Sequence, residues 1–283
     1  MPHPLPPIVL ALAALAATPA PPAAPEASAP VRTLTITARD YAFDAPDTVL
    51  AGRTLVRLVN EGPELHHAFL IRLDAGKTMA DLAAAVKAGG PPPAWAHDVG
   101  GPNAPVPGGT SAAVVTLQPG SYALLCVIPS ADGTPHVMKG MAHPITVVRP
   151  RTAVPTAAER PTTVREPDVT MRLDDYAFTI SKPLTAGSHV LRVTNAARQP
   201  HEVFVAKLAP GKTVRDLAVW VEKMQGPPPG MPMGGTASMG SGESNDVLLD
   251  LTPGEYGLFC FVPDAKDGKP HIAHGMLRQI TVR

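Results

Sequence analysis

Two sets of side chains in this 283-residue sequence contain donor atoms that bind soft metal ions. In each set a cysteine is followed after nine or ten residues by a histidine, and four residues separate that histidine from a methionine. Thiolate, imidazole and thioether together suit copper in both of its oxidation states, whereas zinc rarely takes methionine. The two sets are Cys126, His136 and Met141, and Cys260, His271 and Met276.

A further histidine, His66 or His201, stands at the matching position upstream of each set. His67 follows His66 directly, but adjacent residues on a strand point to opposite faces, so only one of the two can be a ligand. We choose His66, because it matches His201 while His67 matches Glu202. His67 and Glu202 are expected to be partly exposed neighbours of the ligands. The full set of predicted neighbours is His67, Glu202, Asn60 and Asn195.

Each set therefore offers two imidazoles, one thiolate and one weak thioether, which is the ligand set of a type 1 copper site. A single cysteine at the end of a strand is more often a core residue, but the same four residue types occur twice at matched positions. The alternatives are a pair of degenerate sites that keep the motif but bind metal weakly and a disulfide between Cys126 and Cys260. The disulfide is disfavoured, because each cysteine is expected inside its own domain.

The chain is a tandem duplication with a period of about 135 residues. Asp40–Phe43 recurs as Asp175–Phe178, and LQPGSYALLC, ending at Cys126, recurs as LTPGEYGLFC, ending at Cys260. Residues 149–166 between the copies are rich in Pro, Thr and charge, which is typical of an extended linker. We therefore predict one domain at 31–148 and a second at 167–283.

Short stretches of alternating apolar and polar residues, separated by Gly and Pro, predict strands of a β-sandwich in each copy. One helix is expected to interrupt each copy. Thr78 with Asp81, and Thr213 with Asp216, have the spacing of a capping box at a helix start. The helical spacing that follows runs over 79–90 and 214–226 until glycine and proline end it. The predicted fold class is all-β, with two tandem sandwiches that each carry one helix.

At the ligand segments the chain resembles the cupredoxin family. The motifs that carry the resemblance are G-x-Y-x-x-x-C before each cysteine and H-x-x-x-G-M at the end of each ligand loop. The resemblance covers residues 32–148 and 167–283, and it implies Greek-key β-sandwiches with up to two copper ions per chain, each near one end of its domain. The long Cys-to-His loop is similar to the type 1 loop of copper nitrite reductases.

The resemblance implies single-electron transfer with a redox partner protein, or with a copper donor or acceptor. Copper oxidases and nitrite reductases place a His before the Cys and use His-x-His pairs, whereas here Leu125 and Phe259 precede the cysteines and no His-x-His occurs. We therefore expect that the chain is not an enzyme. The alternatives are a copper carrier or storage protein without redox turnover and an interaction module with vestigial sites.

Composition and the N-terminal segment bear on partners and location. The chain has 24 Lys and Arg residues and 24 Asp and Glu residues, so its net charge is zero. This charge gives no electrostatic reason to expect binding to nucleic acid. Residues 1–30 combine a short apolar run, Ile8–Ala17, with an Ala/Pro-rich tail, which predicts a signal peptide cleaved near Ala16. We expect a periplasmic or secreted protein without stable membrane insertion after cleavage. The alternative is a leader that stays as an anchor, since no Lys or Arg precedes the run.

Other soft or titratable side chains receive simpler interpretations. His143 and His274 lie near the ligand loops but have no counterpart in the other copy, so we expect them at the rim or the surface. Three methionines occupy a Gly/Ser/Pro-rich segment that we expect to be a flexible loop able to capture Cu(I) or to pack irregularly. They are Met231, Met233 and Met239.

Overall fold

The computed structural model describes residue 1 and residues 31–88, 92–150, 162–223 and 226–283. The predicted leader, apart from residue 1, and most of the predicted linker at 149–166 lie outside the described residues. None of the helices in the described ranges is long and apolar enough to cross a membrane.

The first copy consists mainly of short strands, as its alternating sequence predicts. Its elements are β1 (Arg32–Arg39), β2 (Ala42–Asp44), β3 (Thr48–Leu50), β4 (Gly52–Asn60), β5 (Phe69–Leu73), α1 (Met79–Ala88), β6 (Ala96–Gly100), β7 (Thr110–Leu117), β8 (Gly120–Leu125) and β9 (Ala142–Val148). A short 3-10 helix, His136–Lys139, lies between the last two strands.

The second copy repeats this order from the end of the linker, except that β3 has no counterpart among its described strands. Its elements are β10 (Val169–Asp174), β11 (Ala177–Ile180), β12 (Gly187–Asn195), β13 (His201–Leu208), α2 (Val214–Lys223), β14 (Gly230–Met239), β15 (Ser244–Leu251), β16 (Gly254–Phe259) and β17 (Leu277–Val282). The matching 3-10 helix is His271–His274. The predicted all-β class with one α-helix in each copy is confirmed.

Strand β4 shows why these sequences form a sandwich. Thr54, Val56 and Leu58 are buried, while the intervening residues are exposed or half-buried, which is the period of two that a strand with one inner face requires. The inner faces of each copy build one main core cluster. The first contains Ile36, Leu58 and Tyr122 with Cys126, and the second contains Leu173 with Cys260.

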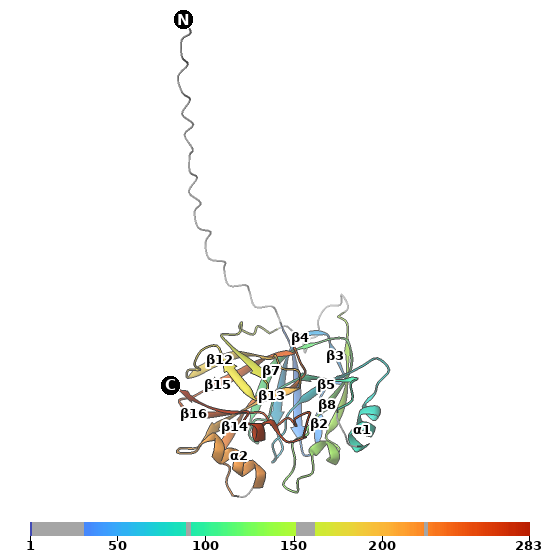
Figure 1. Ribbon diagram of the computed structural model, residues 1–283. Coiled ribbons are helices and arrows are strands. Elements are labelled where there is room, and N and C mark those ends of the chain that lie inside the picture. Colours follow the sequence, from blue (N-terminus) through green and yellow to red (C-terminus); the bar gives the residue numbers. More distant parts are fainter. Residues whose placement is uncertain (2–30, 89–91, 151–161, 224–225) are drawn as a thin grey trace.

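The two copies share both layers of the sandwich (Figure 1). One sheet has the order β11-β10-β12-β15-β7-β4-β1-β2, so β15 of the second copy pairs with β7 of the first. The other has the order β17-β16-β13-β14-β6-β5-β8-β9-β3 and joins the copies where β14 meets β6. Pairing edge strands across the copies satisfies backbone groups that would otherwise remain open to other chains.

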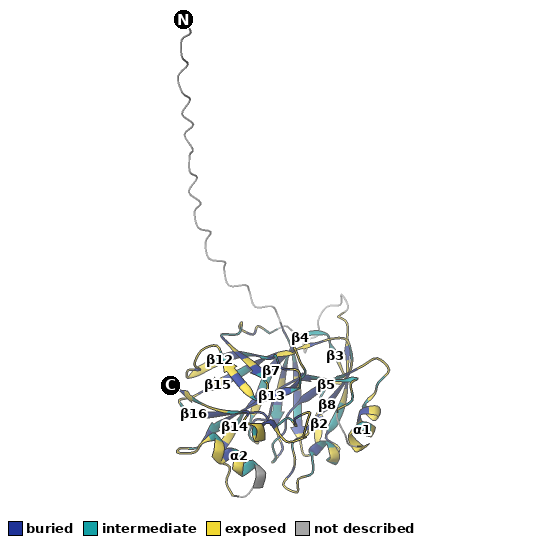
Figure 2. Cartoon of the chain, viewed as in Figure 1, coloured by how far each residue is buried: buried dark blue, intermediate teal, exposed yellow. Residues whose placement is uncertain are grey.

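Both helices begin where the capping-box spacing predicts. The Thr78 hydroxyl accepts a hydrogen bond from the Asp81 N–H, and the Asp81 carboxylate accepts one from the Thr78 N–H at 2.8 Å. Thr213 and Asp216 make the same reciprocal bonds at α2. Figure 2 shows both helices at the periphery, with α1 largely exposed and α2 partly so. Leu82 of α1 is buried against strand residues of the first copy.

The methionine segment 230–239 is a strand and not the flexible loop that its composition predicts. As β14 it pairs with β13 along its length, with two register shifts. Met239 is completely buried, Met233 is partly buried and Met231 is exposed. Pairing with β13 therefore outweighs the low strand propensity of the glycines and the proline.

Candidate metal centres

The loop that carries the ligands in the first copy closes back on its cysteine. Cys126 directly follows β8, and its N–H donates to the carbonyl of Met141, while its own carbonyl accepts the N–H of Val137. His136 starts the 3-10 helix, and its N–H donates to Ile128 O. Gly140 then turns the chain in the left-handed region at φ 99°. The nine residues after the cysteine therefore return the histidine to it.

In the first copy the donor atoms lie at distances that suit one metal ion. Cys126 Sγ is 3.4 Å from His136 Nδ1 and 4.0 Å from His66 Nδ1, and the two Nδ1 atoms are 3.1 Å apart. A trigonal ion with bonds of about 2.0 Å to nitrogen and about 2.3 Å to sulfur requires separations of about 3.5 to 3.7 Å. All three side chains are completely buried, so water does not compete for the site.

The second copy has the same arrangement. Cys260 Sγ lies 3.2 Å from His271 Nδ1 and 3.8 Å from His201 Nδ1, and again all three residues have no exposed surface. The loop closes as in the first copy, with the Cys260 N–H donating to Met276 O and the Met276 N–H to His271 O. The two sets could therefore hold up to two metal ions.

The protonation behaviour of these groups suits metal ligation. Burial lowers the pKa values of His66 and His201, and it lowers that of His271 to about 4, so these imidazoles are neutral and have a free lone pair. Burial also raises the pKa of the Cys126 thiol to about 12, and it raises that of Cys260. A bound cation reverses this effect on a thiol, because it stabilises the thiolate directly.

Carboxylates lie behind the ligand histidines, a feature that the sequence analysis missed. Asp40 Oδ1 is 2.5 Å from His66 Nε2, and Glu64 Oε2 is 2.8 Å from His136 Nε2. In the second copy Asp175 Oδ1 is 3.1 Å from His201 Nε2. A carboxylate at Nε2 fixes the proton there and leaves Nδ1 free as the metal ligand. Asp40 and Asp175 belong to the repeated DYAF motif, and this repetition could have identified them from the sequence.

His271 completes this pattern with a looser contact. Asp264 Oδ2 lies 3.7 Å from His271 Nε2, which is too long for a hydrogen bond, and that nitrogen has no other partner among the described residues. The Tyr176 hydroxyl donates to the same carboxylate at 2.5 Å, and this bond lowers the Asp264 pKa. The carboxylate is therefore ionised beside the second centre.

A tyrosine packs on the loop histidine of each centre. The Tyr41 ring lies 4.9 Å from the His136 ring between centroids, and its hydroxyl donates to Glu64 Oε1 at 3.0 Å. The Tyr176 ring lies 5.5 Å from that of His271. Each centre thus combines a ligand histidine, a tyrosine and a carboxylate that accepts the tyrosine hydroxyl.

The carboxylate of this group comes from different repeat positions in the two copies. Glu64 matches Gln199 in the duplication, whereas Asp264 matches Ser130. In the first copy the Ser130 hydroxyl donates to Tyr41 Oη at 3.2 Å, and in the second the Gln199 amide donates to Asp264 at 3.1 Å. The negative charge beside the loop histidine is thus kept although the residue that carries it has changed place.

His67 and Glu202 are buried, contrary to the expectation that they are partly exposed. Their exposed fractions are 5% and 7%. Each accepts the N–H of the residue that follows the ligand cysteine. His67 Nε2 accepts that of Val127 at 3.1 Å, and Glu202 Oε1 accepts that of Phe261 at 2.8 Å. Their burial follows from this bond, which draws each side chain beneath the ligand loop.

Asn60 and Asn195 shape the turn that precedes the upstream histidine. The Asn60 side chain donates to Glu64 O at 2.8 Å and accepts the Gly62 N–H at 3.0 Å. Asn195 makes the equivalent bonds to Gln199 O and the Ala197 N–H. Both are completely buried, and they position the loop without contacting a ligand atom themselves.

The methionines and the remaining histidines occupy different environments. Met141 and Met276 are completely buried in the same core clusters as Cys126 and Cys260. Both cysteines are free thiols in separate clusters, so the alternative of a disulfide between them is not realised. Two further histidines lie toward the surface beside carboxylates, His143 near Asp47 at 3.1 Å and His274 near Asp267 at 3.2 Å.

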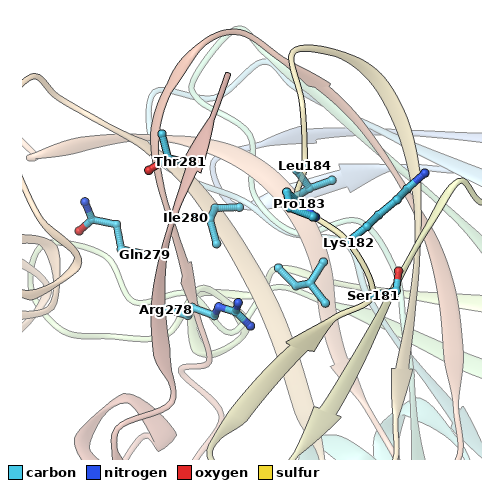
Figure 3. A pocket seen from close by; sticks show the side chains of 9 residues that line it. Ser181, Lys182, Pro183, Leu184, Arg278, Gln279, Ile280 and Thr281 are labelled. Atoms are coloured by element: carbon cyan, nitrogen blue, oxygen red, sulfur yellow. The ribbon is translucent and has the colours of Figure 1, made fainter.

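A surface pocket lies apart from the ligand sets, between the segment after β11 and strand β17 (Figure 3). None of its lining residues belongs to either set, and it contains neither histidine nor cysteine. The lining residues are Ile180, Ser181, Lys182, Pro183, Leu184, Arg278, Gln279, Ile280 and Thr281. The residues suited to metal chemistry are therefore in the buried sets and not in this pocket.

Comparison with known proteins yields likenesses among solved structures. No family model matches the chain. No curated protein matches it either. Auracyanin from Roseiflexus castenholzii is 19% identical over 40% of this chain and 94% of its own, with a TM-score of 0.29. A blue copper oxidase from Nitrosomonas europaea is 18% identical over 89% of this chain and 85% of its own, with a TM-score of 0.24.

A copper-containing nitrite reductase from Thermus scotoductus is 14% identical over 89% of this chain and 61% of its own, with a TM-score of 0.24. The expectation that the chain is not an enzyme is therefore wrong. Solved structures similar to it include this reductase and the blue copper oxidase, both enzymes.

Proposed function

We propose that this chain, with its duplicated cupredoxin-like fold, binds one type 1-like copper ion in each copy and transfers single electrons. One observation carries the proposal. In each copy two Nδ1 atoms and one cysteine sulfur from completely buried residues converge, at separations that a single ion can span. The donor chemistry fits copper, since imidazole and thiolate accept both Cu(I) and Cu(II).

Copper held by such a set supplies reversible one-electron chemistry between two oxidation states. The role of the protein is to keep the donors in place when the charge of the ion changes. Backbone hydrogen bonds fix Cys126 and His136 within one closed loop, and Asp40 orients His66 from outside. A rigid, dry ligand set reorganises little during electron transfer. We assign the axial thioether to Met141 and, in the second copy, to Met276.

Copper titration of the purified chain tests this function. We expect an intense thiolate-to-copper band in the visible spectrum and two copper ions per chain. Cys126→Ser and Cys260→Ser should each remove one ion and the corresponding part of the band. His97→Ala is the matched control, because His97 is an exposed histidine paired with Asp74 and lies outside both sets.

The outcomes separate the proposed function from its alternatives. Binding of Cu(I) without the visible band would favour a carrier or storage protein and contradict electron transfer. Failure to bind copper in either oxidation state, with both cysteine variants behaving like the original chain, would leave an interaction module with vestigial sites.

We further propose that the chain is exported by its N-terminal segment to the periplasm or the exterior. The support is the apolar run Ile8–Ala17 and the small residues Ala14 and Ala16 around Leu15, which suit a signal peptidase. N-terminal sequencing of the protein from the non-cytoplasmic fraction tests this. A start shortly after Ala16 supports export, and an intact Met1 in the cytoplasmic fraction contradicts it.

A further inference from the structure

A chain of hydrogen bonds leaves the second centre toward the first copy. The Glu202 N–H donates to the ligand sulfur of Cys260 at 3.4 Å. One oxygen of the Glu202 carboxylate accepts the Phe261 N–H, while the other, Oε2, accepts a hydrogen bond from Asn103 Nδ2 at 3.0 Å. Asn103 belongs to the first copy, so this bond crosses between the copies.

The connection continues from Asn103 to the cysteine of the first centre. The Ala68 N–H donates to the carbonyl of Pro102, the residue before Asn103, at 3.0 Å. Ala68 follows His67, whose Nε2 accepts the N–H of Val127, the residue after Cys126, at 3.1 Å. Cys126 and Cys260 are thus joined by four hydrogen bonds and the short covalent segments between them. We call this connection the inter-copy bridge; it consists of His67, Ala68, Pro102, Asn103 and Glu202.

The inter-copy bridge is buried and held from several sides. All five of its residues are buried. The Asn103 side chain accepts the Ala104 N–H at 2.8 Å, and the Asn103 carbonyl accepts the Ser111 hydroxyl at 2.6 Å. Gly101, at φ 116°, allows the close approach to Ala68, because a Cβ at this position would lie 2.1 Å from the Ala68 carbonyl oxygen.

An apolar cluster formed by both copies packs beside the bridge. From the first copy it includes Leu65, next to the ligand His66, and from the second Phe259, next to the ligand Cys260. The Phe259 and Phe261 rings are stacked at 5.9 Å. Apolar side chains next to both ligand sets therefore pack in one cluster.

The bridge also accounts for the difference between the copies at one repeat position. His67 and Glu202 match in the duplication, and both accept the N–H of the residue after the cysteine. The accepting imidazole nitrogen of His67 is used by that one bond. A carboxylate has a second oxygen, and in Glu202 this oxygen reaches Asn103 of the other copy. Of the two matched residues, the one whose side chain binds the other copy is therefore the glutamate.

We propose that the inter-copy bridge carries electrons between the two copper centres of one chain, an inference that rests on the proposed function. One electron leaves Cu(I) in one copy, giving Cu(II), and reduces Cu(II) in the other copy to Cu(I). No covalent bond forms or breaks, and no proton has to move. An electron accepted at one centre can thus leave from the other.

The test measures electron exchange within one chain. Both sites are loaded with copper in a Met141→Leu background, which raises the potential of the first centre by removing its thioether. A flash-generated reductant then adds less than one electron per chain, and the thiolate-to-copper bands report where it resides. We expect equilibration at a rate independent of protein concentration. Asn103→Ala and Glu202→His should slow it by about tenfold.

Glu202→His is the second variant because it installs the residue of the first copy, which already fits beneath an equivalent loop. Ser238→Ala is the matched control, since Ser238 donates to Asp98 of the other copy at 2.6 Å without joining the bridge. Reduction potentials, measured separately, should change little in Asn103→Ala, so that slower exchange reports the lost connection and not an altered centre.

Three results overturn the bridge. They are exchange that depends on protein concentration, exchange as fast in Asn103→Ala and Glu202→His as in the background, and equal slowing by Ser238→Ala. Absence of the visible band in the unsubstituted chain would instead overturn the proposed function, and the bridge with it. A normal band with unchanged exchange overturns the bridge alone.

Discussion

Replacing Glu64 by glutamine tests how the outer carboxylates set the potential of the first centre. Burial alone would raise the pKa of Glu64, but hydrogen bonds with His136, Ser130 and Tyr41 lower it below its usual value, so the group is ionised at neutral pH. Its charge stabilises Cu(II) more than Cu(I). Glu64→Gln should therefore raise the reduction potential of the first centre.

The geometry sets the size of the effect. Glu64 Oε2 lies 2.8 Å from His136 Nε2. Adding the imidazole ring and a metal–nitrogen bond of about 2.0 Å places the charge about 7 Å from an ion on Nδ1. At an effective dielectric constant of about 20, a unit charge at that distance contributes about 2.4 kcal/mol, or about 100 mV for one electron. The Glu64 side chain is 32% exposed, and solvent screening reduces the expected shift to about 50–100 mV.

Spectroelectrochemical titration of the copper-loaded chain measures this shift. Glu61→Gln is the control, because Glu61 lies in the same loop but is exposed and paired with Arg39. The double variant Glu64→Gln with Ser130→Asp reproduces the arrangement of the second copy and should return the potential toward its original value. An unchanged or lower potential in Glu64→Gln, or an equal rise in Glu61→Gln, would refute the electrostatic reasoning.

Three further predictions concern stability, each measured by urea unfolding of the metal-free chain. Thr78→Ala removes the cap of α1 and should cost about 1 kcal/mol. Gly235→Ala should cost at least about 3 kcal/mol, because a Cβ there would lie 1.9 Å from Val203 O, whereas Gly108→Ala, at φ 75° in open space, should cost about 1 kcal/mol. Burial raises the pKa of Asp98 to about 6, so the protonated carboxyl adds fully to the free energy of unfolding below pH 4. This stabilisation, up to about 3 kcal/mol, is lost as pH rises through 6. Asp98→Asn should remove this pH dependence of the free energy of unfolding.

The repeat and the residue types predict the fold class and the His, Cys and His side chains that lie together in each copy, because both signals are local and occur twice. The pairing of strands of one copy with strands of the other is not predictable in this way. Pairing between β7 and β15 depends on which strand edges meet, and an alternating pattern says nothing about its partner. For the same reason segment 230–239 resembles a loop by composition but forms a strand once β13 is beside it.

The carboxylates at the centres escaped sequence analysis for a related reason. Glu64 has no acidic match in the second copy, and Asp264 has none in the first, so a search for matched residues passes over both. Only the folded chain shows that the two side chains serve the same tyrosine–histidine pair. His67 and Glu202 were recognised as a matched position, but their burial depends on a backbone N–H whose partner cannot be read from sequence.

The two copies share the features that each metal centre needs and differ at a residue where the copies contact each other. Each centre keeps a negative charge beside its loop histidine even though the residue that carries it has moved, which indicates that the charge matters more than its position in the chain. At the position of His67 and Glu202 the bond under the ligand loop is kept, while the residue type differs where the copies touch. The bond under the ligand loop needs only one acceptor atom, whereas Glu202 uses its second oxygen to bind Asn103 of the other copy. The difference at this position is therefore best explained by contact between the copies, and the bridge variants test whether that contact also conducts electrons.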